Sequence, residues 1–245
     1  MLKFREKVAY GLGDTASNIV FQTVMLYLAF FYTDVFGISP VFVGTMFLAV
    51  RVIDAITDPL MGAIADRTQT KYGKFRPYLL WFALPFGLIS VLAFTTPDFT
   101  ETGKMWYAFL TYTALMMVYT AINIPYCALG GVLTADPKER VSVQSVRFVF
   151  AMLGGLMVTA LTGTLVDYFG QGDKAKGYQL AILAMSVLGV LMFLACFWGT
   201  KERISPPPSQ QSSFKDDFKA LWQNDQWRVL SIAAVFLLTG SVLRN

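Results

Sequence analysis

Three ionisable residues lie within an otherwise apolar stretch from Val41 to Ile64: Arg51, Asp54 and Asp58. Arg51 and Asp54 are three residues apart and Asp54 and Asp58 four apart, so the three side chains share one face of a helix. A charge at the centre of a membrane helix costs about 2.5–3.5 kcal/mol on insertion scales. Such residues are therefore rare, and they usually pair with another group or take part in function. Two carboxylates and one guanidinium sum to a charge of −1, which a single monovalent cation would balance.

Two interpretations fit this trio. In the first, it is a structural ion pair that orients the helix, with Arg51 as the charge partner. In the second, Asp54 and Asp58 bind a coupling ion, and the second carboxylate beyond charge balance favours this interpretation. Pro59 disturbs the helical hydrogen bonds and frees carbonyl oxygens, while Thr57 offers a hydroxyl close to the same face. Oxygen ligands suit Na⁺, with Asp54 and Asp58 as its metal ligands, or a proton exchanging between paired carboxylates.

Polar residues also mark two other apolar segments. The first segment carries a stripe at intervals of four residues, and the fourth carries a group before a proline: Asp14, Asn18 and Gln22, then Tyr119, Thr120, Asn123 and Pro125. Amide and phenol groups donate and accept hydrogen bonds, which suits a ligand rich in hydroxyls. The rings of Tyr119 and Tyr126 are candidates to stack on a sugar ring. The alternative is that these side chains only bond neighbouring helices or pack in the core.

The elements that carry these residues are predicted to be membrane helices. Of 245 residues, 55% are hydrophobic and 15% charged, whereas soluble domains are about 25% charged. A spanning helix needs about 20 mostly apolar residues. The sequence supplies six such segments and the beginning of a seventh near Trp227: Leu12–Tyr32, Val41–Ile64, Tyr78–Phe94, Met105–Leu133, Phe148–Val166 and Tyr178–Thr200. We therefore expect an all-α protein in the lipid bilayer, and no large soluble domain.

The distribution of lysine and arginine predicts the orientation. Basic residues precede the first segment and concentrate in alternate loops, for example at Arg67, Lys71, Lys74 and Arg76. Because basic loops stay on the cytoplasmic side, the N-terminus is expected in the cytoplasm, with the chain in the inner (plasma) membrane. The net charge of +4 follows from this bias and does not indicate nucleic-acid binding. The chain has no histidine, so any proton handling must use carboxylates.

The order of segments predicts three parts. Residues 1–200 are expected to form a six-helix bundle of two three-helix repeats, which is typical of one half of a transporter. Residues 201–226 are expected to be a cytoplasmic linker, with a proline- and serine-rich stretch followed by a short interfacial helix over 214–222. Residues 227–245 are expected to be the start of a truncated helix 7. We thus expect the C-terminal half of the same transporter to be missing.

The loop after the second segment has a pattern of its own. Asp66 and Arg67 follow the end of that segment, and further basic residues come after them. The simpler interpretation is a basic cytoplasmic loop. The other is a conformational gate, in which Asp66 pairs with a basic group of a neighbouring helix in one state only. Arg140 and Arg147, with Glu139, are candidate members of this gate, and Arg147 alternatively reaches towards a substrate.

Several of these residues belong to separated patterns that occur together in a known family. Gly-x-x-x-Asp-Arg after the second segment, followed by Gly-Lys-x-Arg, resembles the loop motif of the major facilitator superfamily. More specifically, the chain resembles the glycoside–pentoside–hexuronide:cation symporters of that superfamily, from the N-terminus through about the sixth segment. The matching stretches are Tyr10–Gly13, Tyr32–Asp34, Arg51–Gly62, Gly73–Pro77 and Asn123–Tyr126.

The resemblance implies uptake of a sugar coupled to Na⁺ or H⁺, with no other cofactor. It implies Asp54 and Asp58 as cation ligands, with Thr120 as an additional oxygen ligand. Thr57, the hydroxyl taken above as a further ligand, stands at a position with asparagine in a known member, which leaves the choice between Na⁺ and H⁺ open. The implied substrate-binding residues are Asn18, Asn123 and Arg147, and they join Tyr119, which the polar group of the fourth segment already indicates. Asn18 and Asn123 match aspartates that hold galactosyl hydroxyls, so α-galactosides are not expected, while Arg147 matches an arginine near the sugar and would favour a uronic acid.

The predicted function is therefore that of a transporter and not an enzyme. The chain is expected to be the N-terminal half of a symporter that imports a glycoside, pentoside or hexuronide by alternating access. Two alternatives remain. One is a membrane sensor or an inactive truncated fragment, and the other is a transporter of a lipid-like substrate on the same fold.

Overall fold

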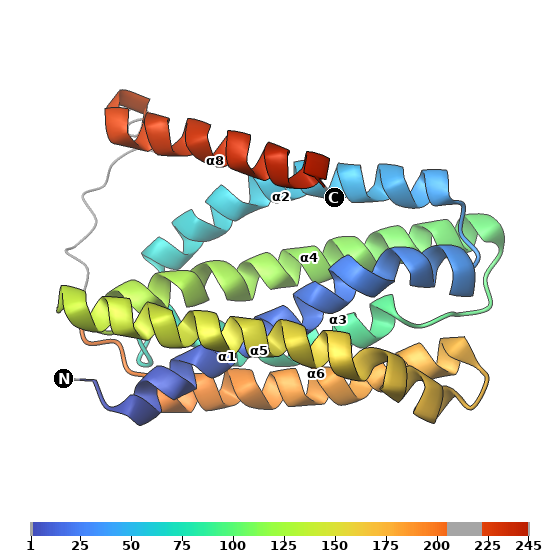
Figure 1. Ribbon diagram of the computed structural model, residues 1–245, viewed down its shortest axis with the longest axis horizontal. Helices are drawn as coiled ribbons and strands as arrows, with labels where there is room; N and C mark the ends of the chain where they lie inside the picture. The colour runs from blue at the N-terminus through green and yellow to red at the C-terminus, as the bar shows by residue number, and fades with distance from the viewer. Residues whose placement is uncertain (1, 205–221, 245) are drawn as a thin grey trace. The chain divides into compact units, whose positions relative to one another are not determined.

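The computed structural model describes residues 2–204 and 222–244, and these residues are almost entirely helical (Figure 1). Outside the helices, Thr70 and Gly73 form an isolated bridge in the α2–α3 loop. The helices are α1 (Phe4–Thr23), α2 (Pro40–Arg67), α3 (Arg76–Ala93), α4 (Glu101–Val132), α5 (Pro137–Gly170), α6 (Lys174–Gly199) and α8 (Asp225–Arg244). The expected all-α fold is confirmed for the described residues.

The first helix is longer than the sequence predicted. It begins at Phe4 instead of Leu12, because charged residues at a membrane-helix end leave the bilayer without ending the helix. After α1 it continues through two short π-helical segments, Val24–Leu28 and Phe31–Val35. The wider π-turns shift the register of the later side chains, so α1 and its extension do not present one continuous stripe.

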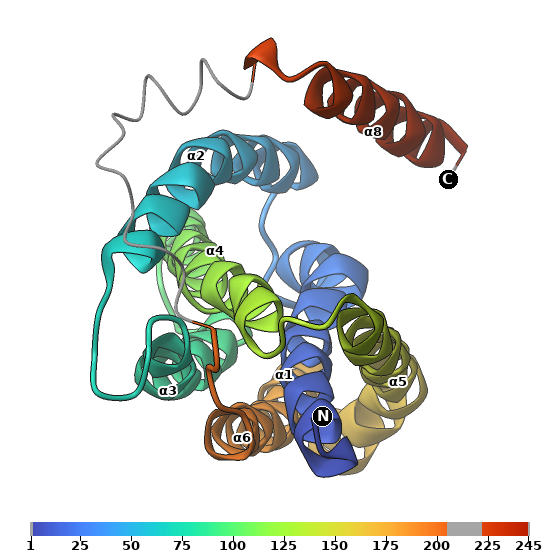
Figure 2. The ribbon, with the colours of Figure 1, turned by 90° about the vertical axis from the view of Figure 1, so that its left-hand side faces the viewer.

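The six helices α1–α6 pack as two interleaved triplets. α1 packs mainly against α5 and α6, while α4 packs mainly against α2 and α3, and α3 packs against α6. Figure 2, seen along the helices, shows this arrangement. Exchanging α1 with α4, α2 with α5 and α3 with α6 reproduces these contacts, as expected for two three-helix repeats. The contact between α5 and α6 is extensive and has no comparable equivalent between α2 and α3.

A buried pair of tyrosines joins the first helices of the two triplets. Tyr10 of α1 and Tyr126 of α4 stack with ring centroids 4.8 Å apart and an angle of 23° between the rings. The Tyr126 hydroxyl donates to the carbonyl oxygen of Tyr10 over 2.7 Å, and the Tyr10 hydroxyl donates to the carbonyl oxygen of Tyr126 over 3.4 Å. Both hydroxyls are buried and thereby have a hydrogen-bond partner.

Five of the described helices, α2 to α6, are long and apolar enough to cross a membrane. α1 is not among them, because its first turns are charged and its middle is polar. Within their most apolar windows, 22% of α2 and of α5 is buried, against 44% of α3 and α6 and 56% of α4. α2 and α5 therefore flank the bundle and present apolar side chains outward, such as Ile56 and Met152.

The end of the chain is a separate unit. The chain divides into a unit from Met1 to Ser205 and a second from Pro206 to Asn245. The predicted linker at 201–226 and the interfacial helix at 214–222 fall mostly on residues 205–221, which lie outside the described residues. Helix α8, Asp225–Arg244, covers the segment where a seventh helix is expected to begin.

Candidate functional site

The three ionisable residues of α2, Arg51, Asp54 and Asp58, lie where α2 packs against α4. The Arg51 Nη1 atom is 3.3 Å from Asp54 Oδ2, so the expected ion pair is present. The Thr120 hydroxyl of α4 donates to Asp58 Oδ1 over 2.8 Å. The structure thus brings together Asp54, Asp58 and Thr120, from two helices that pack side by side.

One oxygen of this cluster is left without a partner. Asp54 is 8% exposed, and its Oδ1 atom is buried with no hydrogen-bond donor among the described residues. A buried carboxylate oxygen that lacks a donor carries a desolvation cost, which a bound cation or proton would remove. The Thr57 hydroxyl instead donates to the backbone carbonyl of Asp54 over 3.4 Å.

Pro59 lies inside α2 and contributes to the same region. Proline has no backbone N–H, so the carbonyl oxygen of Ala55, one turn earlier, lacks its usual helical donor. Carboxylate, hydroxyl and carbonyl oxygens are the ligands that hard monovalent cations prefer. The sum of the side-chain charges of Arg51, Asp54 and Asp58 is −1, so one such cation makes the cluster neutral.

A second polar cluster joins α1, α4 and α5. The Arg147 Nε atom of α5 donates to Asp14 Oδ2 of α1 over 2.9 Å. Asn18, one turn after Asp14, donates from Nδ2 to the Asp14 carbonyl oxygen over 3.0 Å and lies 3.5 Å from Asp14 Oδ1. On α4, the Cys127 thiol lies 3.4 Å from Arg147 Nη2 and 4.0 Å from Asn123 Oδ1. The structure therefore gathers three of the four expected substrate residues, Asn18, Asn123 and Arg147.

Asp14 is a member of this cluster that the sequence prediction did not include among the site residues. It stands in the polar stripe with Asn18, and that spacing was the available signal. No pattern in the sequence singles out Arg147 as its partner from among the basic residues, because the two are 133 positions apart. The pairing also answers the open question about Arg147, which contacts Asp14 and not the predicted gate residue Asp66.

Tyr119 and Tyr126, the two candidates to stack on a sugar ring, differ in how deeply they are buried. Tyr126 is fully buried against Tyr10, with Arg147 over its ring at 5.3 Å, so the structure favours the alternative interpretation for this residue, packing in the core. Tyr119 is half-buried and stacks on Phe21 of α1, with ring centroids 5.6 Å apart. Tyr119 therefore lies at the α1–α4 contact, on the same two helices that carry Asn18 and Asn123.

The predicted gate residues lie at the bundle end that carries the N-terminus, but they do not pair with one another. Asp66, near the end of α2, has an exposed side chain and forms an ion pair at 2.9 Å with the mostly buried Lys74 of the following loop, where a basic group of a neighbouring helix was expected. Arg67 is exposed beside it. Arg140 donates to the carbonyl oxygens of Thr134 and Gly131, at the end of α4. In this conformation the Arg140 guanidinium is therefore hydrogen-bonded to nearby backbone carbonyls and not to Asp66.

Two other carboxylates hold this end of the bundle together. Glu202, just after α6, accepts hydrogen bonds from the backbone N–H groups of Lys74, Phe75 and Arg76 over 2.8, 2.8 and 2.9 Å. These groups belong to the start of α3, where free N–H groups attract negative charge. Glu6 of α1 binds the Arg203 guanidinium through both carboxylate oxygens, and this hydrogen bonding raises the pKa of Arg203.

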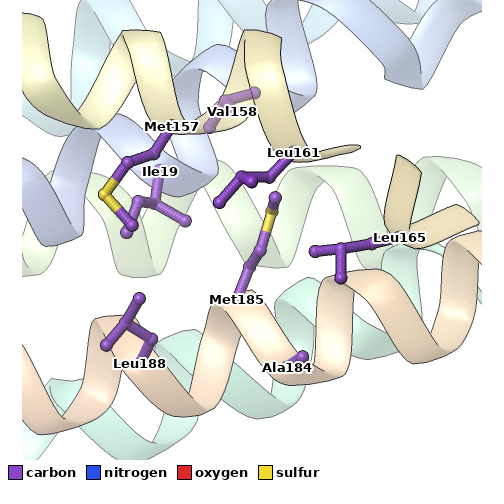
Figure 3. Close-up of a pocket in the computed structure, with 8 residues that line it drawn as sticks. All are labelled: Ile19, Met157, Val158, Leu161, Leu165, Ala184, Met185 and Leu188. Carbon is purple, nitrogen blue, oxygen red and sulfur yellow. The ribbon is translucent and has the colours of Figure 1, made fainter. Parts of the chain in front are cut away.

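A small pocket lies elsewhere, between α1, α5 and α6 (Figure 3). It has a volume of about 120 Å³ and only apolar lining residues: Ile19, Met157, Val158, Leu161, Leu165, Ala184, Met185 and Leu188. None of these side chains offers a strong hydrogen-bond donor or acceptor, so this pocket is unsuited to a sugar or a cation.

Comparisons with known proteins agree with this architecture. A family model described as "MFS/sugar transport protein" matches residues 9–245. The chain is 51% identical over its full length to "Inner membrane symporter YicJ" of Escherichia coli, and 48% identical to "Putative glycoside/cation symporter YagG" of the same organism. It is 40% identical, over 94% of its length, to "Isoprimeverose transporter" of Lactiplantibacillus pentosus.

The chain spans about half the length of the curated relatives it matches. It covers 53% of each of the two Escherichia coli proteins and 49% of the Lactiplantibacillus protein. The region matched by the family model includes most of α1 and all of α2–α6 and α8.

Proposed function

Because this chain belongs to the MFS/sugar transport protein family, we propose that it is the N-terminal half of a cation-coupled sugar symporter. The coupling ion, Na⁺ or H⁺, binds at Asp54 and Asp58, with the Thr120 hydroxyl beside it. The sugar binds at the second cluster, and the opposing half closes over both. Alternating access then moves the two substrates across the membrane together.

The unpartnered Asp54 Oδ1 atom is the observation that carries this proposal. It is buried, it belongs to a cluster with a charge of −1, and a hydroxyl and a second carboxylate lie in the same cluster. A purely structural ion pair needs one carboxylate for Arg51. The second one, Asp58, is held by α4 and stays available as an acceptor for a cation.

Coupling follows from the placement of the two clusters on shared helices. α4 contributes Thr120 to the cation cluster and Asn123 to the sugar cluster, less than one turn apart. A cation that changes the position of Thr120 thereby changes the position of Asn123. By reciprocity, the sugar raises the affinity for the cation by the same factor as the cation raises the affinity for the sugar.

The test is the variant Asp58→Asn in the complete gene product that contains this chain. Sugar uptake is measured in vesicles with an imposed Na⁺ gradient, with an imposed proton gradient, and by exchange of sugar without a gradient. We expect the variant to lose accumulation against a sugar gradient while it retains exchange, because only the cation ligand is removed. Asp98→Asn, in the exposed α3–α4 loop, is the control and leaves accumulation unchanged.

Two results would speak against the proposal. Undiminished accumulation in Asp58→Asn would remove this residue from the coupling site. Absence of uptake or exchange for every sugar, in a wild-type protein that reaches the membrane, would favour a membrane sensor instead. The gradient that drives uptake in the wild type identifies the coupling ion.

The proposal places the chain in the inner (plasma) membrane with its N-terminus in the cytoplasm. The basic α2–α3 loop, with Lys71, Lys74 and Arg76, supports this orientation. Alkaline phosphatase is active only outside the cytoplasm, so fusions report the side of a loop. A fusion after Thr100 is expected to be active and one after Thr70 inactive, and the reverse result would invert the topology.

A further inference from the structure

The ion pair between Asp14 and Arg147 determines the charge of the proposed sugar site. Its two atoms, Asp14 Oδ2 and Arg147 Nε, are 2.9 Å apart, and the side chains are 9% and 21% exposed. One residue comes from α1 and the other from α5, so the pair spans the contact between these helices. Among the described residues, Arg147 is the only arginine in this cluster. The negative charge of Asp14 balances its positive charge.

Neighbouring groups on three helices hold the pair in place. Asn18 donates to the backbone of Asp14, and Cys127 of α4 contacts Arg147 Nη2. The Arg147 guanidinium also lies over the Tyr126 ring. Close packing adds to this, because a Cβ atom on Gly154 of α5 would lie 3.0 Å from the Asn18 Cβ atom. Groups on α1 and α4 therefore contact the ion pair directly, and α1 and α5 pack closely beside it.

An anionic sugar would have to compete with Asp14 for Arg147. Its carboxylate would take over the guanidinium and leave the Asp14 carboxylate buried and unpaired, which is strongly unfavourable. An uncharged sugar faces no such penalty. Its hydroxyls can use the amide groups of Asn18 and Asn123 and the remaining N–H donors of Arg147, with the ion pair intact.

We infer that the transporter takes uncharged glycosides, and that Asp14 is the residue that excludes hexuronides, by occupying Arg147. The inference rests on the proposed function and narrows its substrate class. It reverses the expectation from the sequence, in which an arginine near the sugar favoured a uronic acid. The other charged cluster does not alter this balance, because Arg51, Asp54 and Asp58 with one bound cation are also neutral.

The experiment compares matched pairs of sugars in the complete gene product. Methyl β-glucoside and methyl β-glucuronide differ only in having a hydroxymethyl or a carboxylate at one carbon, and methyl β-xyloside lacks that carbon. Each is tested as a competitor of labelled sugar uptake. In the wild type, we expect at least one of the two neutral sugars to compete at a concentration at least tenfold below that of the glucuronide.

The variants test the role of Asp14. In Asp14→Asn, Arg147 is unpaired, so the ratio of glucuronide to neutral-sugar affinity is expected to rise at least tenfold. Asp14→Glu keeps the charge and restores the wild-type preference. The double variant Asp14→Asn/Arg147→Gln removes both charges, so its preference returns towards neutral sugars; it also serves if Asp14→Asn alone does not reach the membrane. The amount of each variant in the membrane is measured on blots.

The outcomes separate this inference from the proposed function. If the wild type takes the glucuronide as well as the best neutral sugar, or if Asp14→Asn leaves the ratio unchanged, the inference is wrong while sugar transport stands. If no sugar in the panel or beyond it is transported, the proposed function itself fails and the inference fails with it.

Discussion

Thr120 of α4 donates its hydroxyl hydrogen to the Asp58 carboxylate of α2 over 2.8 Å, and this bond ties the charged helix to the centre of the bundle. α2 is among the least buried of the membrane helices, and near its middle this bond joins it to α4, while Thr68 bonds Tyr78 of α3 at its far end. The bond therefore sets which way Asp58 faces. It also places a hydroxyl oxygen next to the carboxylate that the proposed cation needs.

Replacing this threonine with valine keeps the shape of the side chain and removes the hydroxyl. We expect Thr120→Val to raise the cation concentration for half-maximal sugar uptake about tenfold, since one lost polar interaction of about 1.4 kcal/mol has that effect. The control is Thr45→Val on α2, whose hydroxyl donates to the Val41 and Phe42 carbonyls of its own helix. An equal response of the two variants would show that Thr120 has no special role.

Glu202 is expected to stabilise the end of the bundle near the N-terminus. Its carboxylate accepts three backbone hydrogen bonds at the start of α3. Glu202→Gln removes the charge and an acceptor, so the free energy of unfolding should fall by about 2 kcal/mol. The measurement is thermal unfolding of the purified complete protein in detergent. Asp98→Asn, which removes an exposed carboxylate, should leave the midpoint within error; a Glu202→Gln midpoint as high as that of the control contradicts the prediction.

Gly154 is expected to be required for the close contact of α1 and α5. A Cβ atom there would lie 3.0 Å from the Thr15 carbonyl oxygen and 3.0 Å from the Asn18 Cβ atom, so Gly154→Val should force the helices apart. We expect a loss of about 1–3 kcal/mol in stability and weaker sugar binding. Gly163→Val is the control on the same helix and should be tolerated, because a Cβ atom at Gly163 would meet no described atom within 4 Å.

The hydroxyl of Tyr126 is expected to contribute to stability without contacting a ligand. It donates to the Tyr10 carbonyl oxygen over 2.7 Å in the buried core. Tyr126→Phe keeps the stacked ring but leaves that carbonyl without this donor, at a cost of about 1–3 kcal/mol in the free energy of unfolding. Tyr168→Phe, at a position that is 73% exposed, should have no effect. A change in sugar affinity in Tyr126→Phe larger than its change in stability would instead place the hydroxyl in the sugar site.

The sequence by itself determined which segments form helices and which residues share a face of each helix. Long apolar segments predicted α2–α6, and the spacing of Arg51, Asp54 and Asp58 predicted that they share a face, because the helical period is a property of the backbone alone. The start of the first helix was less predictable, since charged residues end a membrane span without ending a helix. Hydropathy indicates which residues lie in lipid. It does not indicate where the backbone hydrogen bonds of a helix begin or end.

The tertiary structure alone decided which polar residues meet. Arg147 had several acidic candidates in the sequence, and only the rotation and crossing of α1 and α5 bring it to Asp14, 133 residues away. Likewise, only the packing of α1 against α4 decided between the two interpretations of Tyr126, whose ring is buried against Tyr10. Such pairings depend on how helices turn about their axes when their small residues and aromatic rings pack. That rotation is set by contacts between distant segments, and no local pattern encodes it.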